Sequence, residues 1–157
     1  MEGMEVMKDT KAYIEWIVRY LTQGFVEFKP NADYWHVGSI ENPDGYGKID
    51  GICGDTMEIW LKISGGMIAD ASFLTNGCMS SQLCGSAATF LAKGEHLIDA
   101  LNISAADIIH LFKHFEGIEA HCAILSVSTL YRAIAEYLLK QETAIDFSIL
   151  NLKNTES

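Results

Sequence analysis

Positive charge is scarce in this sequence. Its 157 residues include 11 lysines and arginines against 21 aspartates and glutamates, so the formal net charge is −10. We expect no nucleic-acid partner, because binding would have to overcome repulsion from the phosphates instead of gaining from counterion release. A basic protein partner fits this charge better.

Several familiar motifs are also missing. The sequence contains no C-x-x-C pair, which is the strongest sequence signature of a zinc site. It contains no G-x-S-x-G motif, phosphate loop or dinucleotide fingerprint either. A cysteine-histidine hydrolase is disfavoured, because His121 directly beside Cys122 is a poor geometry for a base and its nucleophile.

The first residues lack the features of a targeting segment. MEGMEVMKDTKAY is acidic, with neither the apolar core of a secretory signal nor the arginines of a transit peptide, which predicts a cytoplasmic protein. Residues 122–139 are apolar but contain Arg132 and Glu136, so we expect a core helix and no membrane span. In a reducing cytoplasm the four cysteines are expected to be free thiols or metal ligands: Cys53, Cys78, Cys84 and Cys122.

The central part of the chain has the two-residue repeat of β-strands. Residues 9–23 predict an amphipathic helix, and 28–47, which hold both prolines, predict a long loop. Residues 46–52 are a weak strand candidate and 56–63 a clear one, because Met57, Ile59, Leu61 and Ile63 alternate with polar residues and Trp60. A turn at Ser64-Gly65-Gly66 leads into a third strand with Met67, Ala69, Ala71 and Phe73 on its inward face.

The remainder of the chain is predicted to be helical. Ser80 or Ser81 is expected to cap a helix that runs to about residue 92, and a short helix should follow over 95–101. Ser104 and Asp107 predict a capping box for a helix to about residue 115. A last helix is expected over 122–140, with one apolar stripe: Ile124, Val127, Leu130, Tyr131, Ile134 and Leu138.

Strands first and helices after them predict an α+β fold. We expect a three-stranded antiparallel meander sheet that is packed on one face by four to six helices. The whole chain, 1–157, should form a single domain with its core at about 46–140 and a C-terminal extension over 141–157. That extension could dock on the domain or on a partner.

A meander would gather residues that are distant in sequence. It places Cys53, Asp55 and Cys78 on the same rim of the sheet. Cys78 and Cys122 each lie near the start of a helix, where the positive end of the helix dipole stabilises a thiolate. Three thiolates with a carboxylate or an imidazole could bind zinc tetrahedrally or hold a 2Fe-2S cluster.

The other cysteine and histidines have plainer interpretations. Cys84 falls inside a predicted helix, on the stripe of Ala88 and Leu91, and is expected to be a small buried hydrophobe. His110 and His114 are spaced like a metal-binding pair but should lie on the exposed polar face of their helix. His36 and His96 have no partner that the sequence identifies.

Four stretches carry a family resemblance: CGDTMEIWLKI, GGMIADASFLTNGCMSS, GSAATFLAKG and IEAHCAILSVSTLYRAIAEY. Over about residues 46–140 they resemble the iron-sulfur cluster assembly scaffold family, the IscU proteins and the N-terminal domain of NifU. The three cysteines occur in the contexts C-G-D, G-C and H-C. These motifs are specific for the family only in combination.

The resemblance implies a non-enzymatic scaffold that binds iron, accepts persulfide sulfur from a cysteine desulfurase, assembles a transient 2Fe-2S cluster and transfers it to apo-proteins or carrier proteins. Cys53, Cys78 and Cys122 would be cluster thiolates and persulfide acceptor candidates. Asp55 and His121 would be the candidates for the fourth ligand of the cluster. Zinc could stand in place of the cluster, and the scaffold would be a monomer or a dimer.

The sequence departs from the family pattern in two places. The Leu-Pro-Pro-Val-Lys segment that engages a chaperone is replaced here by residues 115–120, FEGIEA, with Glu119 at the place of the lysine, so a chaperone partner is in doubt. The Asn-Pro-Arg-Asn segment is reduced to residues 29–31, KPN.

Two alternative functions remain open. They are a zinc-bound SufU-type sulfur acceptor, which the presence of His121 disfavours, and a zinc-stabilised protein-interaction domain.

Overall fold

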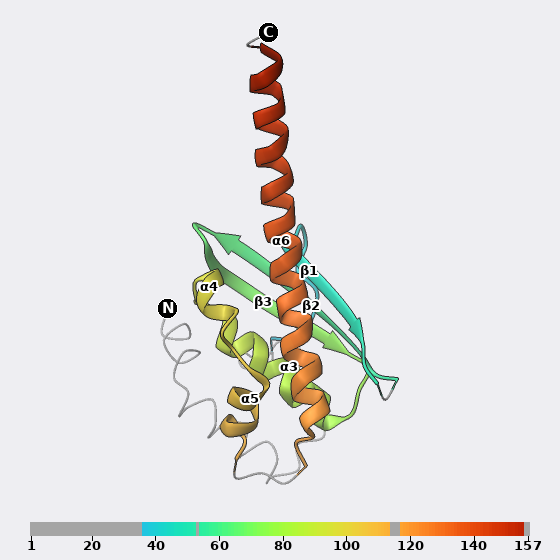
Figure 1. Ribbon diagram of the computed structural model, residues 1–157. Coiled ribbons are helices and arrows are strands. Elements are labelled where there is room, and N and C mark those ends of the chain that lie inside the picture. Colours follow the sequence, from blue (N-terminus) through green and yellow to red (C-terminus); the bar gives the residue numbers. More distant parts are fainter. Residues whose placement is uncertain (1–35, 53, 114–116, 156–157) are drawn as a thin grey trace.

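A three-stranded antiparallel sheet forms the centre of the structure (Figure 1). This computed structural model describes residues 36–52, 54–113 and 117–155, so the helix expected over 9–23 lies outside the described residues. The strands are β1 (Gly45–Asp50), β2 (Thr56–Ser64) and β3 (Met67–Thr75), in the order β1-β2-β3. The predicted meander is confirmed, although β1 begins within the stretch that we expected to be loop.

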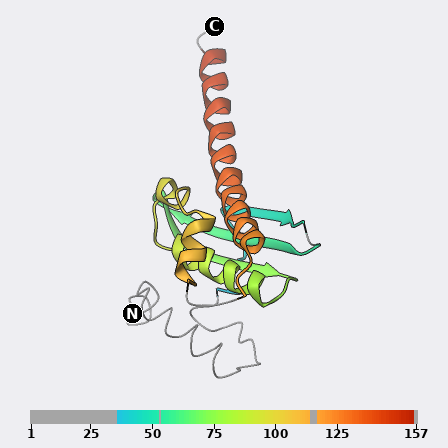
Figure 2. The ribbon, with the colours of Figure 1, turned by 60° about the horizontal axis from the view of Figure 1, so that its bottom comes forward.

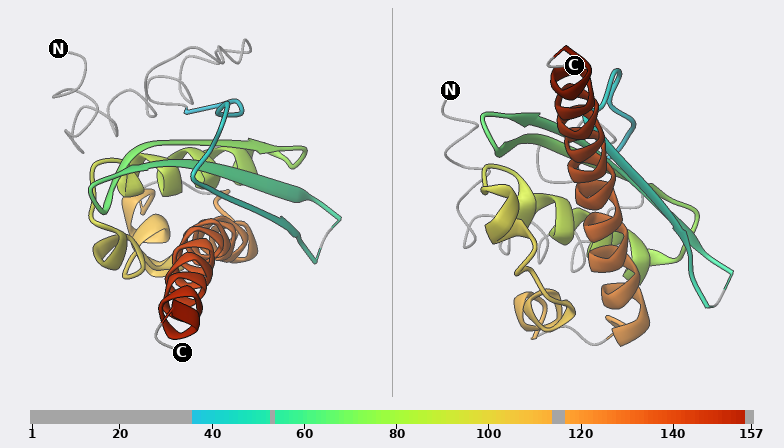
Figure 3. Two further views of the ribbon diagram at one scale, coloured as in Figure 1. Left: turned by 90° about the horizontal axis from the view of Figure 1, so that it is seen from above. Right: turned by 45° about the horizontal axis from the view of Figure 1, so that its top comes forward.

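The helices cover one face of this sheet (Figure 3). Within the described residues they are α3 (Met79–Ala92), α4 (Leu97–Ala100), α5 (Ala105–Leu111) and α6 (Ala120–Thr155). Helix α3 packs on β3, and α6 packs across β1 and β2 (Figure 2). The α+β class is therefore confirmed, and the described helices pack on one face of the sheet as expected.

The hairpin between β2 and β3 turns as the sequence predicts, but the strand after it does not. Gly65 and Gly66 have φ values of 59° and 77°, the left-handed conformation of a two-residue hairpin turn. A register shift then pairs Lys62 with Asp70 but Ile63 with Ile68, so β3 carries one extra residue. This bulge breaks the two-residue repeat. Ile68 is buried in place of Met67 and Ala69, and Ala71 and Phe73 are inward as expected.

The bounds of all four described helices differ from the prediction, and α4 is shorter than the expected 95–101. Helix α3 is preceded by Cys78 at its N-cap, and Ser80 and Ser81 lie inside the helix and are buried, so neither serine caps it. The Ser104–Asp107 capping box is confirmed, but α5 ends at Leu111. Helix α6 starts at Ala120 and continues through the expected extension to Thr155, past the end of the sheet (Figure 1).

Helix α6 packs unusually close to β1 because β1 contributes glycines. A Cβ atom on Gly45 would lie 2.4 Å from the carbonyl oxygen of Ala133, and one on Gly47 would lie 2.7 Å from the backbone nitrogen of Ala133. Ala133 is accordingly fully buried, and Val127, Leu130 and Ile134 of the expected stripe are buried as well. Ile124 and Leu138, which we expected on the buried stripe, are 55% and 40% exposed.

Helix α6 also has the length and composition of a membrane-spanning helix over Ala120–Glu142, but half of its most apolar window is buried inside the fold. The first part of this helix carries buried residues that belong to the hydrophobic core, among them Leu130 and Ile134. The expectation of a core helix is confirmed for this stretch.

Gly47→Ala tests the close packing of β1 on α6. The added methyl group would collide with the backbone of α6, so we expect the free energy of unfolding to fall by about 1–3 kcal/mol. Urea denaturation followed by circular dichroism measures this change. The matched control is Lys48→Ala on the same strand, which is exposed and should change stability by less than about 0.5 kcal/mol. Equal losses in both variants would contradict the close-packing explanation.

Candidate metal centre

The ends of two strands and the starts of two helices meet at one end of the sheet (Figure 1). The register pairs Asp50 with Thr56, and Met57 with Thr75, so the β1–β2 connection lies beside the end of β3. Side-chain hydrogen bonds join the start of β2 to the end of β3. Asn76 Oδ1 accepts from the backbone N–H of Thr56 at 2.7 Å, and Thr75 Oγ1 donates to the carbonyl of Thr56 at 2.6 Å. These contacts hold the segment before Cys78 next to Asp55.

Asp55 is half-buried between the turn and the first residues of α3. Its Oδ2 atom accepts a hydrogen bond from Ser81 Oγ at 2.9 Å. Within the described part of the chain, its buried Oδ1 atom has no hydrogen-bond partner. A Cβ on Gly51 would lie only 2.6 Å from this oxygen, so the glycine makes room for the carboxylate. A buried carboxylate oxygen without a donor is suited to a cation.

Cys78 is exposed and lies at the N-cap of α3. Its thiol pKa is lowered, chiefly by the backbone N–H of Ser81 and also by the N–H of Ser80 and the Ser81 hydroxyl. Partial burial and the negative charge of Glu119 act in the opposite direction. The expected stabilisation of a thiolate at this helix start is thus present, and it comes from individual N–H groups.

Cys122 is fully buried in the first turns of α6, and burial raises its thiol pKa. Its sulfur lies 3.3 Å from Ser81 Oγ, the same hydroxyl that contacts Asp55. A hydroxyl has one proton, so it can donate to only one of these two partners at a time. If the Cys122 thiol and the Asp55 carboxyl are both ionised, the hydroxyl can donate to one of them, and a bound cation would balance the charge of the one left without the hydroxyl proton. The donor set therefore fits a metal ion or a cluster.

His121 stands on the outer side of this group. Together with Asp55 it lines a hollow of about 160 Å³, between the end of β1 and the first turns of α6. Its Nε2 atom lies 2.9 Å from Glu119 Oε2. The ligand atoms of Glu119, His121 and Cys122 all lie within 4.8 Å of one another. The structure thus brings both candidates for the fourth ligand to one site.

The remaining candidates stand as follows. Cys53 lies outside the described residues, as does His114. Cys84 is fully buried in the core, and burial raises its thiol pKa to about 12, which agrees with its prediction as a small hydrophobe. His110 is exposed, as predicted. His96, for which the sequence suggested no role, caps α4 by accepting from the N–H of Ile98 at 3.2 Å.

Two residues of the site were missed by the sequence-based prediction. Ser81 was considered only as a helix cap, and Glu119 only as a departure from a family lysine. Both lie close in sequence to a candidate cysteine, three residues after Cys78 and three before Cys122 respectively. That spacing is the one signal that could have indicated them.

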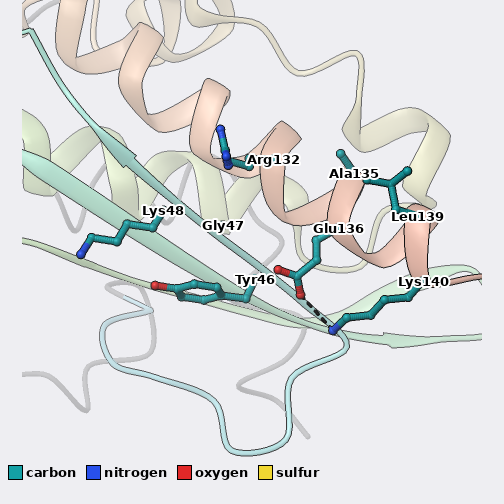
Figure 4. A pocket seen from close by; sticks show the side chains of 8 residues that line it. All are labelled: Tyr46, Gly47, Lys48, Arg132, Ala135, Glu136, Leu139 and Lys140. Carbon is teal, nitrogen blue, oxygen red and sulfur yellow. Dashed lines mark ion pairs between the residues drawn. The ribbon is translucent and has the colours of Figure 1, made fainter.

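A larger open groove lies farther along α6, between that helix and β1 (Figure 4). Its lining includes Tyr46, Lys48 and Arg132, and Glu136 forms an ion pair with Lys140 at 2.9 Å. Tyr46 donates to Glu58 at 2.6 Å, and this hydrogen bond is the main reason why its pKa rises to about 12. None of the lining residues is one of the predicted ligands, so this groove is not the metal centre.

The fold and the site define a class of protein: a small α+β domain that gathers thiol, carboxylate and imidazole groups at one end of a three-stranded sheet. The family model described as NifU-like N terminal domain matches residues 31–144. The chain belongs to this family, and the resemblance noted from the sequence is confirmed.

Curated relatives agree with this assignment, and a solved structure agrees with the fold. Iron-sulfur cluster assembly scaffold protein IscU 1 of Archaeoglobus fulgidus is 35% identical over 106 residues, or 67% of this chain and 69% of the relative. Scaffold protein IscU of Escherichia coli K12 is 36% identical over 112 residues, or 68% and 87%. A crystal structure of a SUF-system protein from Fervidobacterium islandicum AW-1 has a TM-score of 0.52 at 22% identity, covering 65% of this chain and 91% of that chain, which supports the fold alone.

Cys78 should be the most reactive of the described cysteines. It is exposed with a lowered pKa, so a larger share is thiolate at neutral pH than for the buried Cys84 and Cys122, whose pKa values are raised. A short pulse of iodoacetamide at pH 7, followed by tandem mass spectrometry, should show modification of Cys78 before the other two. Urea-unfolded protein, in which the thiols should react at similar rates, is the control. Faster labelling of Cys122 would contradict the assignment.

Proposed function

We propose that this protein is a scaffold on which a 2Fe-2S cluster is assembled and from which it is transferred to apo-proteins. The observation that carries this proposal is the convergence of Asp55 and Cys122 on the hydroxyl of Ser81, with Cys78 at the N-cap of the same helix and His121 at the same hollow as Asp55. The printed names of the curated relatives, which are cluster assembly scaffolds, support it.

In this proposal Cys53, Cys78 and Cys122 are the cluster thiolates. Cys53 lies outside the described residues, and its assignment rests on the C-G-D context that it shares with the family. Asp55 and His121 share the fourth position. A ligand set with an oxygen or nitrogen member holds a cluster less permanently than four cysteines would, which suits a cluster that must leave.

Sulfur would arrive as a persulfide on a cysteine desulfurase. A scaffold thiolate attacks the outer sulfur, the S–S bond of the donor breaks, and the desulfurase cysteine leaves as a thiolate. Among the described cysteines, Cys78 is the best placed acceptor because it is exposed and has a lowered pKa. Cys122 and Cys53 remain candidates, Cys122 requiring that its buried sulfur become accessible.

Closing the cluster also requires electrons. Two ferrous ions and two sulfane sulfurs become two ferric ions and two sulfides when two further electrons are added. A one-electron reductant of the ferredoxin class would supply these electrons in two steps. The residues of the chain would hold iron and sulfur in place during this reduction and would themselves undergo no net change.

The partners of this proposal are a cysteine desulfurase and apo iron-sulfur proteins or carriers. Apolar side chains surround the site at positions open to such partners: Ile52 is 97% exposed, Ile124 is 55% exposed and Met79 is 43% exposed. Exposed apolar groups beside a functional site are typical of a protein contact. We further propose that the chain acts as a single domain, and that it works in the cytoplasm, where its thiols stay reduced.

Anaerobic incubation with ferrous iron, cysteine, a desulfurase and a reductant should produce the visible absorption of a 2Fe-2S centre. Cys122→Ser should reduce the cluster yield at least about tenfold, because it removes a thiolate ligand. Cys84→Ala is the matched control: it removes a buried thiol that is not assigned to the cluster, and the yield should be retained.

Metal and sulfide analysis of the same samples separates the alternatives. One zinc per chain, with no cluster spectrum under any of these conditions, would exclude the scaffold and favour the zinc-bound sulfur acceptor. Zinc that is needed for folding but never accompanied by persulfide would favour a zinc-stabilised interaction domain. Loss of the cluster in Cys84→Ala would show that the role of Cys84 is misassigned.

Asp55→Ala tests the exchangeable ligand. We expect cluster transfer to an apo-ferredoxin to slow by about tenfold, because an exchangeable carboxylate gives the acceptor thiolates a position to enter. The rate is followed by circular dichroism of the holo-ferredoxin. Asp99→Asn, an exposed aspartate on α4, should transfer at the unaltered rate. Equal or faster transfer by Asp55→Ala would remove Asp55 from the release step.

A further inference from the structure

Glu119 lies at the metal centre but is not among the ligands proposed so far. Its Oε2 atom is 2.9 Å from His121 Nε2. One carboxylate oxygen of Glu119, one imidazole nitrogen of His121 and the sulfur of Cys122 lie within 4.8 Å of one another. The three donors need to close by only about 1 Å to reach the spacing of ligands around a single tetrahedral metal ion.

The backbone of Glu119 is fixed at this place from two sides. Its N–H donates to Ser80 Oγ at 2.9 Å, and Ser80 is buried in the first turn of α3. Its carbonyl accepts from the N–H of Cys122 at 3.0 Å and from that of Ala123 at 3.3 Å, at the start of α6. Glu119 therefore joins the two helix starts that carry Cys78 and Cys122.

The charges of the three groups also match a divalent ion. A glutamate and a thiolate contribute two negative charges, and a neutral histidine contributes none, so the set balances an M²⁺ ion. The carboxylate and imidazole suit Fe²⁺, and the same set with the thiolate suits Zn²⁺. The existing Glu119–His121 contact is part-exposed, with side-chain exposures of 55% and 38%, and such pairs add little stability. A metal ion would therefore displace it at low cost.

We propose that Glu119, His121 and Cys122 form a site for one divalent metal ion, with Glu119 as its oxygen ligand. As part of the proposed scaffold function, on which this role rests, the site receives Fe²⁺ before sulfur is delivered. Asp55 and Cys78 are then left for the second iron. Glu119 thus adds a carboxylate ligand that the cysteine pattern does not identify.

Co²⁺ is the probe for this site. The reduced full-length protein is titrated with Co²⁺ under anaerobic conditions, and the thiolate-to-cobalt charge-transfer and d–d absorption bands report binding and coordination. Glu119→Gln should weaken Co²⁺ binding at least about tenfold and alter the d–d bands. Glu119→Lys, which places a positive charge at the site, should weaken it further. Glu41→Gln, an exposed glutamate, is the matched control and should bind as the unaltered protein does.

The result that overturns the proposal is unchanged Co²⁺ affinity and an unchanged spectrum in Glu119→Gln. Glu119 would then be only a surface partner of His121, and the metal would be held by the other ligands. Cluster reconstitution in the same preparations tests the proposed function separately. Weakened Co²⁺ binding in Glu119→Gln, together with no cluster in the unaltered protein, would support the metal site and refute the scaffold function.

Discussion

The buried hydroxyl of Ser81 connects the three segments that make the candidate site. The hydroxyl contacts Asp55 on the β1–β2 connection and Cys122 on α6. The backbone N–H of Ser81 stabilises the Cys78 thiolate at the start of α3. These segments are far apart in sequence and meet only in the folded chain. A hydroxyl is small enough to be buried here and polar enough to satisfy a carboxylate or a sulfur, which an alanine would not do.

The general form of the site follows from patterns that are local in sequence. Alternation in β2 and the double-glycine turn were enough to predict the hairpin, and a meander of short strands must return its third strand to the end where the first turn lies. Asp55 and Cys78 were placed on one rim for this reason. The position of Cys78 ahead of α3 likewise predicts a stabilised thiolate, because a helix start presents free N–H groups. The same prediction for Cys122 is wrong, because burial raises the pKa of its thiol.

The features that escaped prediction depend on contacts between distant segments. The bulge that turns Met67 and Ala69 outward arises from pairing with β2, which the repeat within β3 does not reveal. Val127, Leu130 and Ile134 of the predicted α6 stripe are buried as expected, whereas Ile124 and Leu138 are exposed. The glycines of β1 add Ala133 to the buried face by admitting it closely, which the sequence of α6 alone does not indicate. Serines after a helix start are usually caps, so Ser81 gave no sign that its hydroxyl would be used by two other segments. The roles of the ligands themselves stay predictions.

The single proton of Ser81 bears on how firmly Asp55 could hold a metal. While the hydroxyl donates to Asp55 Oδ2, the hydrogen-bonding capacity of that oxygen is partly used. Of the two oxygens of this carboxylate, Oδ1 is the one with no hydrogen-bond donor among the described residues. When Cys122 loses its proton, the thiolate competes for the same hydroxyl. A metal bound at Asp55 would therefore share the carboxylate with the Ser81 hydroxyl. A carboxylate shared in this way would bind a metal weakly enough to exchange, which fits the cluster transfer proposed for this site.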